Sequence, residues 1–174
     1  MSTAPTRAAR SRRGAAIGRG QRVFAVSRFR DAAARRVFDD AGIEAIPCDA
    51  SDSQQLAQLP DVRNLFFLAG VKFGTSDNPQ LLQRLNVEMP QHVAERFVDA
   101  KIVALSTGCV YSLTTPASGG AREDAPTEPP GDYARSCLGR EQAFCSASRE
   151  GGTRCTLIRL NYSIDLRYGV LVDI

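Results

Sequence analysis

The chain has 174 residues, of which 43% are hydrophobic, and a formal net charge of +3. This length suits one globular domain with a sizeable core, and no apolar run is long enough to span a membrane. The five cysteines are scattered, odd in number and contain no CxxC pair, which argues against a disulfide framework and against a zinc site. These features predict a cytoplasmic protein with reduced thiols, no bound metal and no membrane contact.

The positive charge is concentrated at the start of the chain. The first 30 residues hold eight arginines and no acidic residue, whereas the remainder holds 14 basic and 19 acidic side chains. Such an arm can contact nucleic acid or act as a transit peptide, but residues 1–20 have no interleaved aromatics and no amphipathic stripe. We interpret 1–20 as a basic arm without fixed structure, or a misread start, and disfavour a nucleic-acid partner. The folded domain is expected at 21–174.

From Arg22 onward, short apolar runs alternate with helix-length amphipathic stretches. Strands are expected at 22–26, 43–47, 64–68, 101–105 and 156–160. Helices are expected at 31–41, 81–97 and 133–149, with a short helix or turn near Leu56 and a long Pro- and Gly-rich loop over 114–132. This alternation predicts an α/β protein in which parallel strands are joined by crossover helices.

Particular residues point to a family. The strand at 101–105 runs into Leu105-Ser106-Thr107-Gly108-Cys109-Val110-Tyr111, and Tyr133 opens the next helix. Further marks are Gly20–Val23, Asp49, Leu68–Gly70 and Asn86-Val87. With these marks, the chain resembles the extended short-chain dehydrogenase/reductase group, also called the NAD-dependent epimerase/dehydratase family, from Gly20 to its C-terminus. The resemblance implies a Rossmann-like, doubly wound parallel sheet that binds NAD or NADP and a sugar-nucleotide-like or other small polar substrate.

The resemblance implies a cofactor site at the ends of the predicted strands, because ligands of such folds lie outside the carboxyl ends of the strands. Ser27 and Arg28 follow the first strand, where a Ser-Arg pair in place of an acidic residue favours a 2′-phosphate and hence NADP over NAD. Asp49 would approach the adenine, although the neighbouring Asp52 is equally explained as a helix cap.

Further residues would lie nearer the reacting atoms. Ala69 and Gly70 offer small side chains where the backbone passes close to a cofactor. By resemblance, Asn86 would brace the strand that carries the active site. Thr107 would hydrogen-bond the substrate oxygen, and Tyr133 would exchange a proton with that oxygen as hydride moves.

The chain departs from the family at Cys137. Free tyrosine titrates at about pH 10, so acid/base work near neutrality needs a neighbouring positive charge. The family supplies this charge with a lysine four residues after the tyrosine, where this chain has Cys137, either an inert filler or a reactive thiol near a helix N-terminus. Lys72 is one candidate substitute at the end of its strand. Arg140 shares the helix face but lies about 10 Å further along the helix axis and cannot join a proton relay.

Two parts of the family pattern are not found. Arg12–Gly20 takes the place of the Gly-rich phosphate-binding turn, with wrongly spaced glycines and no strand before them. The chain ends at Ile174, where the family usually continues into a substrate lobe. Because the first strand lies in the middle of a 3-2-1-4-5-6 sheet, its loss leaves the strands at 22–26 and 64–68 without their common partner.

We therefore expect a chain truncated at both ends, lacking the first strand and the Gly-rich turn. Three functions remain open: an NAD(P)-binding protein of the epimerase/dehydratase type with catalysis in doubt, a non-catalytic dinucleotide sensor or interaction module, and a gene fragment without function. A homodimer is compatible with each of the first two.

Overall fold

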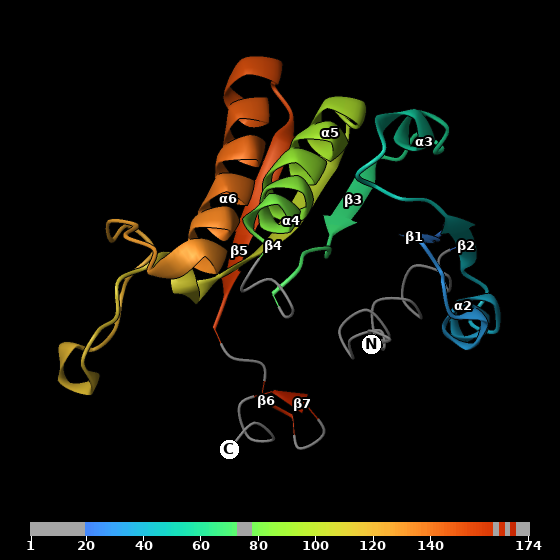
Figure 1. Cartoon of the computed structure of the whole chain (residues 1–174). Helices are drawn as coiled ribbons and strands as arrows, with labels where there is room; N and C mark the ends of the chain where they lie inside the picture. The colour runs from blue at the N-terminus through green and yellow to red at the C-terminus, as the bar shows by residue number, and fades with distance from the viewer. Residues whose placement is uncertain (1–19, 73–77, 162–163, 166–167, 170–174) are drawn as a thin grey trace. The chain divides into compact units, whose positions relative to one another are not determined.

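The computed structural model describes residues 20–72, 78–161, 164–165 and 168–169 (Figure 1). The predicted arm lies outside these residues except for Gly20, and so does most of the tail after Asn161. Residues up to Gln58 form one compact unit, and residues from Leu59 onward form another.

The first unit is a two-stranded parallel sheet with two helices. Its elements are β1 (Phe24–Ser27), α2 (Ala32–Asp39), β2 (Glu44–Pro47) and α3 (Ser53–Ala57). Both helices begin at an aspartate: the Asp31 carboxylate accepts from one backbone N–H of α2, and the Asp52 carboxylate accepts from two of α3. The cap role foreseen for Asp52 is therefore observed. After α2 the chain turns through Gly42, whose φ of 68° suits glycine.

The second unit contains a three-stranded parallel sheet in the order β3-β4-β5. Its main elements are β3 (Asn64–Phe67), α4 (Pro79–Gln83), the π-helical turn η1 (Arg84–Glu88), α5 (Met89–Arg96), β4 (Lys101–Thr107), α6 (Gly131–Gly151) and β5 (Arg154–Leu160). Shorter pieces are the 3₁₀ turns η2 (Gly108–Val110) and η3 (Pro116–Ser118) and the antiparallel pair β6 (Ile164–Asp165) and β7 (Tyr168–Gly169).

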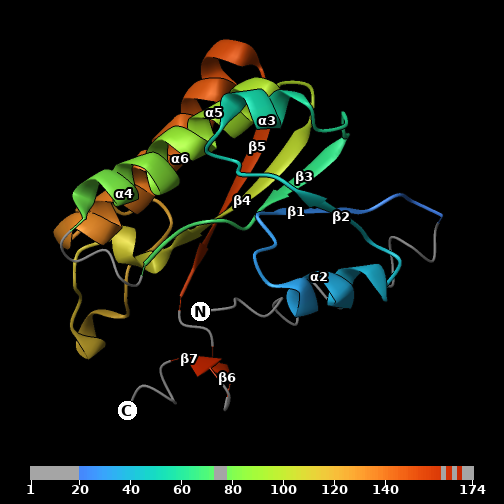
Figure 2. The same cartoon turned by 45° about the vertical axis from the view of Figure 1, so that its right-hand side comes forward.

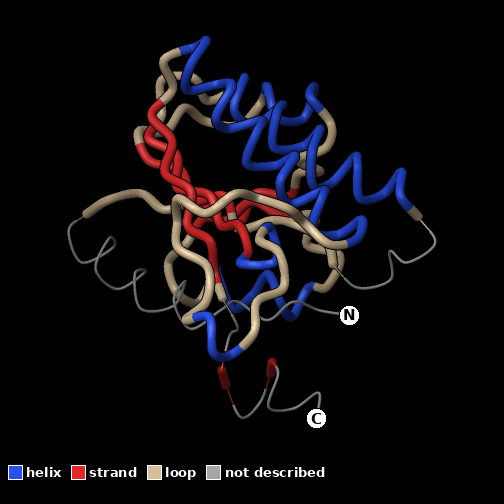
Figure 3. Tube along the Cα trace, turned by 90° about the vertical axis from the view of Figure 1, so that its left-hand side faces the viewer, coloured by secondary structure: helices blue, strands red, loops and turns tan. Residues whose placement is uncertain are grey.

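Helices cover one face of this sheet (Figures 2 and 3). Helix α6 packs on β4, β5 and α5. Along β4, Ile102, Ala104 and Ser106 alternate onto that face and are buried. The Phe67 ring meets the Phe144 ring edge to face, with 5.2 Å between the ring centroids. The core of the unit thus lies between β4 and the α5–α6 pair. This packing holds the carboxyl end of β4 against the beginning of α6.

The structure confirms the α/β class and the parallel strands joined by helices. Predicted strand ends agree with the observed ends to within two residues, and the predicted helix at 81–97 is observed as α4, η1 and α5 in succession. Among the described residues, no strand precedes β1, β1 pairs with β2 alone, and β3 pairs with β4 alone. The extent of the folded domain, 21–174, stays a prediction.

Candidate active site

Helix α6 carries three of the residues singled out from the sequence. Tyr133 lies in its first turn, Cys137 one turn later and Arg140 one turn after that, a spacing that puts them on the same side of a helix. Tyr133 is partly buried, Cys137 is fully buried and Arg140 is 7% exposed. The helix ends at Gly152, whose left-handed φ of 72° provides the C-cap.

The phenol of Tyr133 lies among two thiols and two cations. Its hydroxyl is hydrogen-bonded with the Cys137 thiol, and its pKa is raised well above the usual value, first by burial and then by Cys137 and Cys109. The positive charge of Arg140 opposes this rise in the pKa. The Lys72 Nζ lies 5.7 Å from the centroid of the Tyr133 ring. The phenol is therefore protonated near neutral pH, in a form that can donate a proton.

The thiol of Cys137 is also held in its protonated form. Burial is the largest influence and raises its pKa, whereas the charge of Arg140 and the hydrogen bond with Tyr133 lower it. Because the thiolate is the reactive form of cysteine, a buried thiol with a raised pKa favours the inert filler over the nucleophile.

Thr107 lies at the carboxyl end of β4 and opens η2. Its Oγ1 accepts a hydrogen bond from the Cys109 backbone N–H at 3.2 Å. That bond uses an acceptor site on the oxygen, so the hydroxyl proton can still be donated to a ligand. Turn η2 packs on α6. The carboxyl end of β4, with Thr107, and the start of α6, with Tyr133, therefore lie on the same side of the second unit.

Asn86 is the centre of a buried polar cluster. It lies in the π-helical turn η1 and is 0% exposed. Its Oδ1 accepts from the Val71 N–H at 3.0 Å and from Arg140 Nη2 at 2.7 Å. Its Nδ2 donates to the Val71 carbonyl and to Ser136 Oγ, both at 2.9 Å. Asn86 thus fixes the segment that leaves β3 and ties it to α6.

Gly70 lies directly against the Arg140 side chain. A Cβ added at Gly70 would overlap the guanidinium. Packing within the protein therefore already accounts for glycine at this position, before any cofactor is considered. Ala69, Gly70 and Lys72 are exposed to solvent, as residues that contact a ligand must be before it binds.

Three predicted cofactor residues belong to the first unit. Ser27 ends β1, and its carbonyl accepts from the Cys48 N–H at 3.0 Å. Arg28 is exposed. The Asp49 carboxylate accepts from the backbone N–H and from the hydroxyl of Ser51, at 3.0 and 2.7 Å. Asp49 therefore shapes the turn before α3, and the cofactor roles of these three residues stay predictions.

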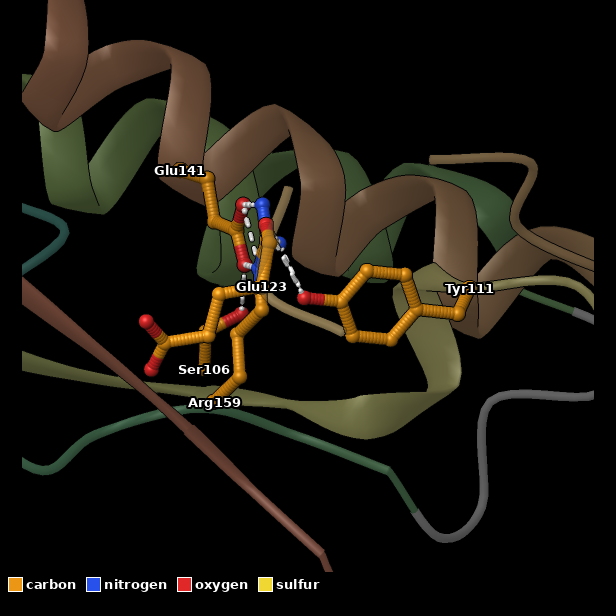
Figure 4. A network of polar contacts seen from close by, with 5 residues as sticks. All are labelled: Ser106, Tyr111, Glu123, Glu141 and Arg159. Atoms are coloured by element: carbon orange, nitrogen blue, oxygen red, sulfur yellow. Dashed lines mark hydrogen bonds and ion pairs between the residues drawn. The ribbon is translucent and has the colours of Figure 1, made fainter. Parts of the chain in front are cut away.

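A largely buried ion pair within the second unit was not anticipated from the sequence (Figure 4). The Glu141 carboxylate of α6 accepts from Ser106 Oγ of β4 and from the guanidinium of Arg159 on β5, whose Nη2 lies 2.8 Å from Oε2. Arg159 also donates to the Tyr111 hydroxyl and to the Glu123 carbonyl. Its hydrogen bonds with Glu141, first, and with Tyr111 raise its pKa. An arginine inside the apolar run Thr156–Leu160 was the available signal, since such a charge requires a buried partner.

The described residues contain neither a metal-ligand cluster nor a membrane-spanning helix. No group of three or more metal-ligating side chains is present among them. No helix in the described ranges is long and apolar enough to cross a membrane. All five cysteines, each within those ranges, are unpaired.

Comparison with known proteins gives a consistent family and fold. The profile of the family described as "NAD dependent epimerase/dehydratase family" matches residues 14–162. No curated protein sequence matches significantly. Among solved structures, the chain is similar to Pal from Bacillus thuringiensis, with a TM-score of 0.74 at 20% identity, over 87% of this chain and 51% of that one.

Two epimerases show the same likeness. UDP-glucuronic acid 4-epimerase from Bacillus cereus, in complex with NAD, has a TM-score of 0.70 at 18% identity, over 88% of this chain and 53% of its own. A UDP-galactose 4-epimerase has a TM-score of 0.74 at 21% identity, over 95% and 57% respectively. The chain spans about half the length of the solved structures it matches. At these identities the likeness shows the fold, which is Rossmann-like, with parallel sheets and flanking helices.

Proposed function

The chain belongs to the NAD-dependent epimerase/dehydratase family, and from that premise we propose that it is an NAD(P)-binding protein of the epimerase/dehydratase type. The observation that carries the proposal is the position of Thr107 and Tyr133. Both residues expected to hold a substrate oxygen lie where β4 ends and α6 begins, on one packed unit.

The segment after β3 supports part of the proposal. Exposed Ala69 and Gly70 follow β3, and the buried amide of Asn86 fixes the backbone immediately after them. We propose that this segment of the second unit contacts the nicotinamide end of the cofactor. Within the first unit, Ser27, Arg28 and Asp49 follow their strands and stay, by resemblance, the proposed contacts of an adenosine group. The cofactor, when bound, would accept or return a hydride.

The substrate proposed is a sugar nucleotide or a related polar molecule with an oxidisable hydroxyl. Thr107 would donate its hydroxyl proton to the reacting oxygen and orient it. The raised pKa keeps Tyr133 protonated near neutral pH and makes its phenol a weak acid, so the phenolate that could take a proton from the substrate is scarce. We infer that proton transfer through Tyr133 is slow in either direction, because Cys137 has no charge to stabilise a phenolate.

A second candidate function, a non-catalytic dinucleotide sensor, is favoured by Cys137 itself. A neutral, buried thiol in the place of an ammonium removes both a charge and a hydrogen-bond donor from the site. Such a protein would retain dinucleotide binding and report it to a partner or to a second copy of itself. The free thiols favour a reducing, cytoplasm-like compartment for either function.

Cofactor binding tests the proposed enzyme and the proposed sensor together. We expect the fluorescence of NADPH and of NADH to titrate with the protein at micromolar concentration. If Arg28 contacts a 2′-phosphate, Arg28→Ala should weaken NADPH binding about tenfold and leave NADH binding unchanged. Arg30→Ala, an exposed arginine two residues away, is the matched control. Absence of any response to either nucleotide at millimolar concentration would remove the proposed function and the sensor reading together.

Turnover separates the enzyme from the sensor. Reduction of NAD or NADP would be followed with UDP-glucuronic acid and UDP-galactose, the compounds named for the structurally similar epimerases. For an enzyme, Cys137→Lys should raise the rate, and Thr107→Ala and Tyr133→Phe should abolish it. Cofactor binding without turnover in the parent chain and in Cys137→Lys would favour the sensor.

A further inference from the structure

Arg140 is a buried cation whose charge is not balanced nearby. Its side chain is 7% exposed. Its Nη1 donates to the Leu105 carbonyl at 3.1 Å and its Nη2 donates to Asn86 Oδ1 at 2.7 Å, both neutral acceptors. Its Nε is buried without a hydrogen-bond partner. Among the residues that the structure describes, no carboxylate forms an ion pair with it.

Such an arrangement is costly, and most buried charges are paired. The surroundings of the guanidinium are nevertheless built to fit it. The Phe67 ring lies 5.9 Å from its central carbon, and Gly70 leaves the space that the guanidinium fills. By contrast, Glu141, the next residue on the helix, is buried and has the partly buried Arg159 as its counterion. An uncompensated charge in a region of low dielectric acts strongly on its neighbours.

We propose that Arg140 is a positioning residue that supplies, from inside the second unit, the fixed positive charge beside Tyr133 that Cys137 cannot supply. The proposal rests on the proposed function, because it assigns Tyr133 a part in proton transfer. Arginine stays protonated, so Arg140 acts by its field and its hydrogen bonds and takes no proton itself.

A chain of hydrogen bonds leads from Arg140 to the backbone of Tyr133. Arg140 donates to Asn86, Asn86 Nδ2 donates to Ser136 Oγ at 2.9 Å, and Ser136 Oγ donates to the Tyr133 carbonyl at 2.8 Å. Long side chains on a helix point back toward its N-terminus, which shortens the distance that the seven-residue separation suggests. The charge of Arg140 lowers the pKa of Tyr133 and that of Cys137, against the effect of burial on both.

The other groups that face the phenol act differently. Cys137 on α6 and Cys109 on η2 raise the pKa of Tyr133. Lys72, which follows β3, places its ammonium 5.7 Å from the centroid of the ring but is itself exposed to solvent. Solvent screens an exposed charge, so the fixed, buried charge of Arg140 is the stronger candidate for tuning the phenol.

The test replaces Tyr133 by 3-nitrotyrosine, whose phenol ionises near neutral pH and then absorbs visible light. The apparent pKa of the nitrophenol is measured without cofactor or substrate in the otherwise unchanged chain and with Arg140→Met, Arg140→Lys and Arg135→Met. Arg135, an exposed arginine of the same helix that pairs with Asp132, is the matched control. Far-UV circular dichroism establishes that each variant is folded.

Arg140→Met should raise the apparent pKa by about one unit, a tenfold change in the ionisation constant. Arg140→Lys should raise it by less than half as much, and Arg135→Met should leave it unchanged. Equal shifts for Met and Lys, or none, would overturn the proposal and leave Arg140 a packing residue. If Arg140→Met does not fold, Arg140→Gln, which keeps a donor for Asn86, should show the full shift, and an unshifted value would overturn the proposal. No cofactor is present, so failure here is distinct from failure to bind a dinucleotide.

Discussion

Replacing Glu141 by glutamine should destabilise the second unit severely. The carboxylate receives bonds from Ser106 Oγ, from Arg159 Nε at 3.0 Å and from Arg159 Nη2 at 2.8 Å, and the residue is 3% exposed. Glutamine keeps the volume but removes the charge and turns one acceptor into a donor. Removing one member of a buried pair costs roughly 3–5 kcal/mol, and because the Arg159 side chain is 25% exposed we place the loss at about 3 kcal/mol, the lower end of that range.

Urea unfolding followed by far-UV circular dichroism measures this loss, since the chain has no tryptophan. A loss of about 3 kcal/mol corresponds to a fall in melting temperature of roughly 6–12 °C for a chain of this size. Arg159→Met and the double variant with Glu141→Gln complete a thermodynamic cycle. Asp61→Asn is the control, because its pair with Arg96 has the carboxylate 91% exposed and should contribute little. A coupling energy below about 1 kcal/mol between Glu141 and Arg159 would refute the reasoning.

Two further outcomes are expected. A Cβ at Gly139 would lie 2.8 Å from Val87 Cγ2, so Gly139→Ala should lower the free energy of unfolding by about 1–3 kcal/mol. In urea unfolding, Val87→Ala should cost less stability in the Gly139→Ala background than it does alone. Strictly additive losses would contradict the overlap. Because the pKa of Tyr133 is raised in the folded protein, any turnover that requires the phenolate should rise about tenfold per pH unit between pH 7 and 9, whereas a plateau near pH 7 would exclude it. The same shift gives a stability contribution that is present below about pH 10 and lost as the pH rises further, so the stability difference between the parent chain and Tyr133→Phe should change only above that pH.

The main strands and helices could be predicted from the sequence because local residue preferences and tertiary packing favour the same structure there. The run Ile102–Leu105 alternates buried and half-buried positions between two neighbouring strands, and α6 ends at Gly151, two residues after the predicted end at 149. The caps at Asp31 and Asp52 follow from side-chain chemistry within three residues. The turn η1 gives no periodic signal of its own, because one extra residue per turn leaves the apolar spacing almost unchanged.

The side-chain clusters were harder to foresee because they depend on contacts far apart in the chain. Asn86 meets Arg140 and Glu141 meets Arg159 only after three strands have aligned. The helical rise placed Arg140 too far from Tyr133 to affect its ionisation. That estimate uses Cα positions alone and ignores the direction in which a long side chain points. Thr107, Tyr133 and Cys137 were identified by resemblance. All three lie in the second unit, and their roles stay predictions.

Helix α6 carries both Tyr133, the proposed proton donor, near its N-terminus and Glu141, which anchors it to the sheet, near its middle. Tyr133 lies in the first turn, while Glu141 clamps the helix to two strands about two turns later. A small tilt permitted at Glu141 would become a larger displacement at the phenol. Substitutions near Glu141 can therefore misalign the Tyr133 phenol without touching a ligand. In α6, substitutions further from Glu141 should be better tolerated.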